Sequence, residues 1–560
     1  MRISTPYIYI AFFLINVAFS YGQRITLNFF TRDSVETAIL NSIKYQKEHP
    51  SVSSVKASVD SVANALEAYG FLNVAMDTVI KSDSLYKISI QLRDRIDRVR
   101  IHFSNTNIHA RDLFRISNKI SDDTFEVSIE ALPAALTDIS RIYESRGRVF
   151  TKVRLKNIAV RQDIIEADLE VRQTGERYLD KIIVKGYPEF PRKFLSNYLD
   201  LKTTTIFNEQ VLKKISDGID QLIFVEEVSP SEVLFTNDST IVYLNLTRKQ
   251  ASSFDGLIGF QSKETGKGLS FNGHLDVSLN NLFNSGESLK VFWKNNGNER
   301  QLFKLAVDLP YFLDTKFSPE FELSIQKQDS SFVNMSGKYL VDYSLSPLSS
   351  IGVFMQNEKS TTLGDNLSAI NVFQSLFLGL RYNLVKNKSG LLFPTVFGFQ
   401  TELSSGKRKI QSAKTNQYRI FLNLEYLLPL NKRNYFYFRN ETNSLISRDS
   451  ILVNELYRIG GATSIRGFNE DSILASSLNI TNFEYRYSTN NSSYFYTITD
   501  LGFVKNEVDG LTETIFSLGL GYAFKTNFSK IDLSYALGKY TDSPFDIQNS
   551  RFHIKIVSSF

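Results

Sequence analysis

The chain has 560 residues, which is too many for one ordinary hydrophobic core, so several domains are expected. Its formal net charge of +5 is small for this length, and basic and acidic residues are interspersed, which argues against a nucleic-acid-binding tail. Cysteine is absent, which excludes disulfides, thiolate metal sites and cysteine nucleophiles.

The first residues have the pattern of a secretory signal peptide. The run Ile8–Phe19 is almost entirely apolar, follows a positively charged start and precedes small residues. Its length suits the apolar part of a signal peptide and is too short for a transmembrane helix. We therefore expect residues 1–22 to be a signal peptide cleaved before Gln23, with Tyr21 as the alternative first residue.

Beyond this segment, no apolar run reaches the roughly 18 residues that a transmembrane helix needs. A chain that spans a membrane without such helices must form a closed β-barrel, because only a barrel then pairs every backbone group inside the bilayer. Aromatic residues make up 13% of the chain and are denser from Phe254 onward. Membrane barrels carry aromatic residues at both interfaces, so this change indicates a domain boundary.

Between residues 23 and 252, one order of elements, β-α-α-β-β, is repeated three times. In the first unit we expect strands and helices at Ile25–Phe29, Val35–Lys47, Ser51–Tyr69, Val74–Ile80 and Tyr86–Leu92. In the second we expect a strand at Val99–Phe103, a helix near Phe125–Arg146 and strands near Lys152–Ile158 and Ile164–Val171. In the third we expect a strand at Asp180–Val184, a helix at Gln210–Ile223 and strands near Ser231–Phe235 and Thr240–Thr247.

These elements predict three small α+β domains, at residues 23–94, 95–175 and 176–252. Gly70 and Gly147 end the long helices of the first two domains, and the third lacks such a glycine, so its repeat is weaker.

The repeated order resembles the polypeptide-transport-associated (POTRA) repeat, as do the phrases Tyr69-Gly70-Phe71-Leu72-Asn73 and Ile183-Val184-Lys185-Gly186-Tyr187. A generic α+β domain is the alternative. A small sheet with an uncovered edge strand can pair with an extended client strand, since its unpaired N–H and C=O groups are a template.

Residues 253–560 change to repeated two-residue alternation. In the segment Phe516–Phe524, large apolar residues alternate with Ser517, Gly519, Gly521 and Ala523. A soluble β-sandwich also alternates, but here the opposite face carries charges as well as small residues from strand to strand. About sixteen such segments occur, with room for the ~9–11 residues that each crossing needs. We therefore predict an all-β, sixteen-stranded antiparallel transmembrane barrel after the α+β domains.

One motif lies between the eleventh and twelfth candidate strands: Arg458-Ile459-Gly460-Gly461-Ala462-Thr463-Ser464-Ile465-Arg466-Gly467-Phe468. Its paired glycines and its Arg-Gly-Phe sequence resemble the signature loop of the BamA/TamA superfamily of outer-membrane assembly factors. Three POTRA units and sixteen strands are most similar to the TamA-like arrangement.

The resemblance implies roles for several residues. The loop would fold into the barrel lumen, with Gly460, Gly461, Gly467 and Phe468 shaping it. Arg466 would pair with an acidic residue on the thirteenth strand. Thr499-Asp500-Leu501-Gly502-Phe503 matches that second motif, so Asp500 and Gly502 are the expected partners. The alternative is an Arg466 exposed on a flexible turn.

In that superfamily the first and last strands pair poorly, and the seam between them opens toward the bilayer. Here the seam would join Phe254–Phe260 to Phe552–Phe560. The first strand contains Phe254, Gly256 and Gly259, and glycine weakens a strand interior. The last contains Phe552 and Phe560, of which Phe560 resembles the terminal aromatic residue of outer-membrane barrels.

The expected function is therefore assembly of outer-membrane proteins, or their translocation, by a bacterial outer-membrane barrel with a periplasmic POTRA arm. The expected partners are the lipid bilayer, unfolded outer-membrane or secreted clients and a periplasmic partner protein, with no nucleic acid and no cofactor. A dedicated two-partner exporter and a lipid-transport barrel are the alternatives. We expect no enzyme, since Gly-x-Ser-x-Gly and His-Glu-x-x-His are absent, and no metal, since the histidines lack ligand spacing.

Overall fold

The computed structural model describes residues 24–559, apart from residues 83, 105, 263–268, 297–299, 330, 364–369, 389–391, 394 and 527–528. The expected signal peptide and Phe560 lie outside the described residues. Across the described residues, no helix combines the length and the apolarity of a membrane-spanning helix.

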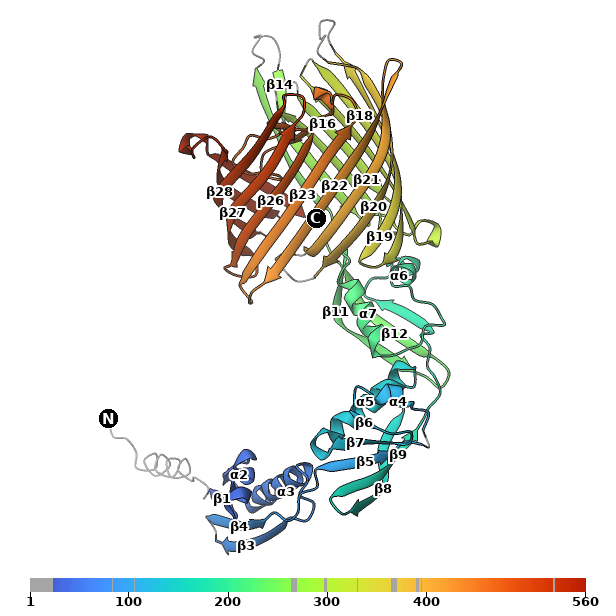
Figure 1. Ribbon diagram of the computed structural model, residues 1–560, viewed down its shortest axis with the longest axis vertical. Helices are drawn as coiled ribbons and strands as arrows, with labels where there is room; N and C mark the ends of the chain where they lie inside the picture. The colour runs from blue at the N-terminus through green and yellow to red at the C-terminus, as the bar shows by residue number, and fades with distance from the viewer. Residues whose placement is uncertain are drawn as a thin grey trace, which may run out of the picture. The chain divides into compact units, whose positions relative to one another are not determined.

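The chain forms two compact units. The first contains the described residues up to Arg177 together with Ile206–Glu209, and the second contains Tyr178–Thr205 together with the described residues from Gln210 onward. The first unit holds two small sheets, and the second holds a third small sheet and a barrel (Figure 1).

The first sheet has the strand order β2-β1-β4-β3. Its elements are β1 (Ile25–Phe30), α2 (Ser34–Ser42), β2 (Glu48–His49), α3 (Val52–Ala68), β3 (Ala75–Lys81) and β4 (Leu85–Gln91). The side chain of Ser51 caps α3 by accepting a hydrogen bond from the backbone of Ser54. Val55, Val62 and Leu66 recur at helical spacing and are buried against the sheet, so apolar periodicity holds this layer together.

The second sheet has the order β6-β7-β5-β9-β8. Its elements are β5 (Arg98–His102), α4 (Ala110–Leu113), β6 (Lys119–Ile120), β7 (Thr124–Ser128), the 3₁₀ turn η1 (Ile129–Ala131), α5 (Leu132–Ser145), β8 (Lys152–Arg161) and β9 (Ile164–Arg172). The helix expected from Phe125 therefore starts only at Leu132. Phe125 and Val127 alternate into the core from strand β7, and Pro133 in the first turn of α5 suits a helix start.

The third sheet has the order β10-β12-β11. Its elements are β10 (Lys181–Lys185), α6 (Arg192–Tyr198), α7 (Glu209–Ile219), β11 (Val225–Phe235) and β12 (Thr240–Arg248). Strand β11 begins six residues before the expected Ser231, and it contains two register shifts against β12. Those bulges break the two-residue alternation, which hid the start of the strand from the sequence.

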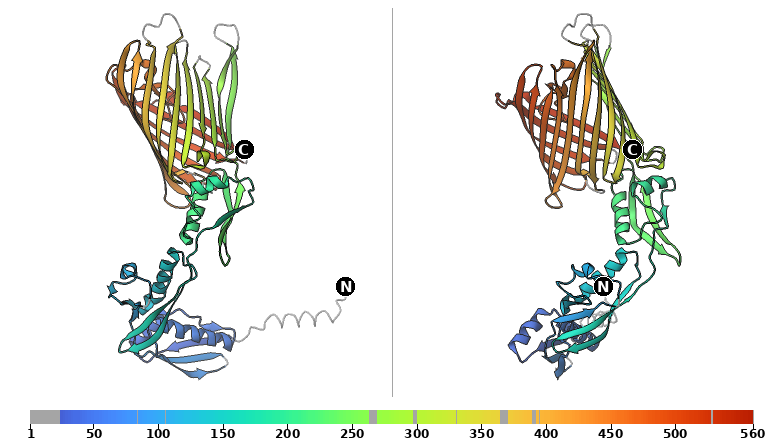
Figure 2. Two further views of the ribbon diagram at one scale, coloured as in Figure 1. Left: turned by 90° about the vertical axis from the view of Figure 1, so that its right-hand side faces the viewer. Right: turned by 45° about the vertical axis from the view of Figure 1, so that its right-hand side comes forward.

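The barrel is closed, and its strands pair antiparallel in chain order (Figure 2). The sixteen strands are β13 (Ser253–Ser262), β14 (Leu269–Asn280), β15 (Ser288–Asn296), β16 (Gln301–Asp308), β17 (Phe317–Gln328), β18 (Phe332–Ser346), β19 (Ser349–Thr362), β20 (Phe373–Asn387), β21 (Thr395–Ile410), β22 (Ala413–Pro429), β23 (Asn434–Ser447), β26 (Ser477–Ser488), β27 (Ser493–Asn506), β28 (Leu511–Lys525), β29 (Ser529–Tyr540) and β30 (Arg551–Ser559). The sixteen-stranded barrel expected from the sequence is confirmed.

The two faces of the barrel wall differ in chemistry. In β28, Leu518 and Leu520 are exposed on the outside, whereas Ser517 and Ala523 are fully buried on the inside. This alternation places large apolar side chains outside and small or polar side chains inside, which is the period-two pattern of the sequence.

Within the second unit, the third α+β domain contacts turns at one end of the barrel. The hydroxyl of Tyr187 donates to Asn284 at 2.7 Å and accepts from Asn281 at 3.0 Å. Phe194 of α6 packs so closely against Gly286 that a Cβ there would lie 2.6 Å from its ring. Two ion pairs, Lys193–Asp314 and Lys316–Asp200, add to this contact.

Candidate functional site

The candidate site is built on the segment between β23 and β26, residues 448–476, which we call the inner loop. It contains the 3₁₀ turn η3 (Val453–Glu455) and a short hairpin of β24 (Tyr457–Ile459) and β25 (Ile473–Ala475). Its side chains contact inward-facing residues of several barrel strands, as described below, so the inner loop lies inside the barrel.

Arg466 of the inner loop is bound to Asp500 of β27, the thirteenth barrel strand. The guanidinium donates to both carboxylate oxygens, from Nε at 2.9 Å and from Nη2 at 2.6 Å, and the backbone N–H of Arg466 donates to the same carboxylate at 3.0 Å. Arg466 is 6% exposed and Asp500 is fully buried. Such a bidentate, charge-assisted contact fixes both the side chain and the loop backbone.

A second carboxylate completes the charge balance around Arg466. Glu484 of β26 accepts from Nη1 of Arg466 at 2.5 Å and from Nε of Arg486 at 2.8 Å. The Arg486 guanidinium lies 3.8 Å from the ring centroid of Tyr437. The buried guanidinium of Arg466 and the largely buried guanidinium of Arg486 thus face two buried carboxylates, which offsets the cost of removing each charge from water.

Sequence reasoning missed Glu484 and Arg486. Both sit at inward positions of a strand whose outward positions are Phe483, Tyr485 and Tyr487. A charged residue at alternate positions of an otherwise aromatic strand was the signal that could have found them.

The glycines and Phe468 let the inner loop approach the wall closely. Gly467 has a φ of +82°, and a Cβ there would lie 2.5 Å from the backbone nitrogen of Gly538 in β29. Phe468 packs edge-on against Tyr540, with ring centroids 5.4 Å apart. Only glycine fits position 467, because both its backbone conformation and the space around it exclude a side chain.

The remaining glycines of the two motifs lie nearby. Gly460 and Gly461 open the tight turn after β24, where the backbone N–H of Gly460 donates to Ser464 at 2.8 Å. Gly502 of β27 leaves room for the fully buried side chain of Ile465. A Cβ at position 502 would lie 3.3 Å from that side chain. The structure therefore places the motif residues of the inner loop and those of β27 in one cluster.

A second anchor holds the start of the inner loop, and sequence reasoning missed it. The Glu455 side chain is fully buried and accepts from Arg408 of β21 at 2.5 Å and from Gln417 of β22 at 2.8 Å. The neighbouring Asn454 donates to Ser360 of β19 at 2.7 Å. The loop is thus held to β19, β21 and β22 as well as to β26 and β27.

The seam between the first and last strands has the shortest ladder of the barrel among the described residues. Strand β13 pairs with β30 only at Ser253↔Ser559 and Phe254↔Ser558. By comparison, β13 pairs with β14 at ten positions and β29 pairs with β30 at eight. Few backbone hydrogen bonds therefore join the two ends of the sheet.

The candidate seam residues lie apart from one another. Phe254 and Phe552 are exposed on the outside of the barrel, at 43% and 61%, but Phe552 pairs with Tyr535 of β29 and not with β13. Gly256 and Gly259 lie in the part of β13 that pairs with β14 and has no described partner in β30. Phe560 lies outside the described residues.

Residues 378–524 match the family model of the haemolysin secretion/activation proteins ShlB/FhaC/HecB. This matched segment is about a quarter of the chain and includes both Arg466 and Asp500. A comparison with curated proteins found no match.

Two of the solved structures that match this chain share its architecture at low sequence identity. CdiB from Escherichia coli is 13% identical, with a TM-score of 0.53, over 94% of this chain and 98% of its own. CdiB from Acinetobacter baumannii is 13% identical, with a TM-score of 0.51, over 90% and 97% of the two chains. BamA from Haemophilus ducreyi lacking POTRA domains 1–3 is 15% identical over 83% and 100%, with a TM-score of 0.46 that is too low to establish a shared fold. The chain therefore has the fold of the CdiB structures.

Proposed function

We propose that this protein lies in the outer membrane of a Gram-negative bacterium and moves client polypeptides into or across that membrane. The observation that carries the proposal is the inner loop of the sixteen-stranded barrel, fixed to the wall by Arg466 and Asp500. The match to a family of secretion proteins covers both residues, which supports a role in protein transport.

The outer surface of the barrel supports a membrane location. Leu378, Leu380, Leu520 and Ile554 come from different parts of the wall and are each more than half exposed. A wall of exposed aliphatic side chains suits lipid better than water, and fifteen of the sixteen described strands reach the roughly nine residues that a crossing needs.

The short seam supports a route for clients. Because only two described pairs join β13 to β30, separating them sacrifices few hydrogen bonds. The exposed strand edges would then offer unpaired N–H and C=O groups to an incoming client strand. On this proposal, client folding supplies the energy.

The α+β domains support a receiving arm in the periplasm, with the three domains resembling POTRA repeats. Each of the three small sheets has an edge strand of seven or more residues, which is β3 in the first, β8 in the second and β11 in the third. Each can accept an extended client segment by strand addition. We also propose that these three domains and the barrel form a TamA-like arrangement.

A dedicated exporter of one secreted protein is the second candidate. The family-model match favours it, because that family is described by its secretion and activation of haemolysin. The two candidates differ in the number of clients and not in the site.

Quantitative proteomics after depletion of the protein separates the candidates, with cells re-expressing the wild-type chain as the control. Loss of many barrel proteins from the outer membrane is expected for an assembly factor. Loss of one secreted protein, with other barrels unchanged, is expected for an exporter. Unchanged outer-membrane and secreted proteomes would contradict both.

A further inference from the structure

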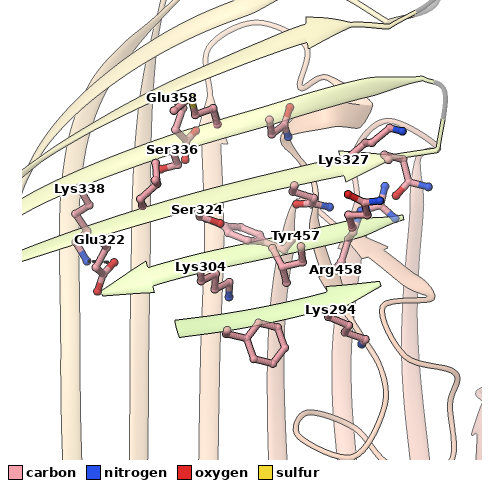
Figure 3. Close-up of a pocket in the computed structure, with 18 of the residues that line it drawn as sticks. Lys294, Lys304, Glu322, Ser324, Lys327, Ser336, Lys338, Glu358, Tyr457 and Arg458 are labelled. Carbon is pink, nitrogen blue, oxygen red and sulfur yellow. Dashed lines mark ion pairs between the residues drawn. The ribbon is translucent and has the colours of Figure 1, made fainter. Parts of the chain in front are cut away.

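The barrel encloses a cavity of about 730 Å³ that the Arg466 cluster does not use (Figure 3). Inward-facing side chains of β15–β19 form most of its wall, and inner-loop residues 454–458 and Asp471 border it. Its volume lies in the range of roughly 300–1,000 Å³ typical of small-molecule sites.

The most deeply held carboxylates around this cavity already have cationic partners. Glu358 accepts from both terminal nitrogens of Arg419, at 2.6 and 2.7 Å. Glu455 is paired with Arg408 at 2.5 Å. These carboxylates are therefore not available to neutralise other cations.

Several further cations at the cavity lack such a partner, among them Lys290, Lys304 and Arg458. In the part of the chain that the structure describes, no carboxylate lies within 4.0 Å of the side-chain nitrogens of Lys290, Lys304 or Arg458. Among the described carboxylates of this cavity, Asp276 has no ion pair and Glu322 has one contact at 4.0 Å. The unpaired charge of the cavity is thus mainly positive.

The strand register gathers these lysines. Lys290 and Lys294 flank Phe292 on the inward face of β15, and Phe292 is the register partner of Lys304 on β16. Lys304 is therefore diagonal to both other lysines, at about 7–8 Å between backbones. Ammonium groups gathered on one face repel one another, and the single carboxylate of Asp276, which faces Phe292 from β14, offsets only part of this repulsion.

We propose that this cavity binds a small molecule carrying phosphate-type oxyanions, held by Lys290, Lys304 and Arg458. The planar guanidinium of Arg458 suits bidentate contact with an oxyanion, and the lysines act as point charges. All three cations line the same cavity, so an anion with several charges is attracted to them more strongly than a single carboxylate is.

The site also adjoins the inner loop. Lys294 contacts Glu470 at 3.1 Å and Asp471 at 3.5 Å, and all three residues are partly exposed. An anion that reaches Lys294 competes with these two carboxylates and so loosens one contact between the loop and β15.

Isothermal titration of the full chain in detergent micelles with sodium pyrophosphate, at fixed ionic strength, tests the proposal. Saturable one-to-one binding is expected for the wild type. The variant Lys290→Gln with Lys304→Gln should weaken it about tenfold or more, since two charge-assisted contacts are lost. The matched control, Lys530→Gln with Lys555→Gln, removes the same charge from a different lumenal cavity and should leave binding nearly unchanged.

Heat-dependent gel mobility verifies that each variant is folded, and Arg458→Gln provides a second variant outside the barrel wall. The proposal is overturned if pyrophosphate gives no saturable binding or if both lysine pairs weaken it equally. It is also overturned if polyglutamate binds and pyrophosphate does not, because the cavity then recognises acidic polypeptide.

Discussion

Arg466 and Asp500 are joined by three hydrogen bonds, although they are 34 residues apart in the chain. One of the three comes from the backbone of Arg466, so the carboxylate holds the course of the inner loop as well as its side chain. The pair is buried, and Glu484 provides a second counter-charge. Removing Arg466 leaves the carboxylate of Asp500 buried without its cationic partner.

Arg466→Ala should destabilise the barrel by about 3–5 kcal/mol, because Asp500 then remains charged and buried without its partner. Arg466→Lys should retain only part of this stability, since an ammonium cannot replace the bidentate contact. Urea unfolding in micelles measures both effects. Arg448→Ala, at an exposed position of the same loop, is the control, and equal stability of Arg448→Ala and Arg466→Ala would contradict the role of the pair.

Gly467→Ala should cost at least about 1–2 kcal/mol, because the residue has a positive φ and its side chain would meet the backbone of Gly538. Gly337→Ala is the matched control, as a Cβ there meets nothing within 4 Å. The same unfolding measurement applies. A Gly467→Ala protein as stable as Gly337→Ala would show that the loop does not need this close approach.

Glu455→Gln should destabilise the barrel by about 3 kcal/mol, although the new side chain has nearly the same shape. It leaves the guanidinium of Arg408 buried without a carboxylate. Glu513→Gln, at an exposed position, should have almost no effect. Limited proteolysis of the inner loop gives a second readout. Cleavage of Glu455→Gln at the wild-type rate would show that Glu455 does not anchor the loop.

Locking the seam should stop transport. The chain has no cysteine, so Phe254→Cys with Ser558→Cys introduces a single pair of thiols at register partners, which lie within disulfide reach. Oxidation should block client delivery, and reduction should restore it. Ser253→Cys with Ser278→Cys links β13 to β14 and should leave delivery intact. Full activity with the seam oxidised would exclude opening between β13 and β30.

Much of the fold could be predicted from the sequence, because the α+β domains show helical periodicity and the barrel shows two-residue alternation. Strict alternation, as in β28, identified the barrel and its inward face. The helix expected from Phe125 failed at its start, because a short strand running into a helix has no clear period over five residues. Bulges in β11 hid the start of that strand in the same way.

The candidate site could be predicted from the sequence only in part. Arg466 and Asp500 came from a resemblance to known motifs, and the structure brings them together. Glu484 carries only the weak signal of a charged residue between aromatic neighbours on its strand, and Glu455, in the inner loop, carries none. Arg486 lies two residues from Glu484 on the same face of β26, whereas Arg408 meets Glu455 only through the path of the inner loop inside the barrel.

The inner loop, held to the wall by Arg466, is expected to enable client transport. The most direct test depletes the native protein and re-expresses either the wild type or Arg466→Lys at equal levels in the outer membrane. The secreted and outer-membrane proteomes are then measured. We expect the wild type to restore the lost clients and Arg466→Lys to leave most of them missing. Full restoration by Arg466→Lys would show that transport does not need the bidentate contact between Arg466 and Asp500.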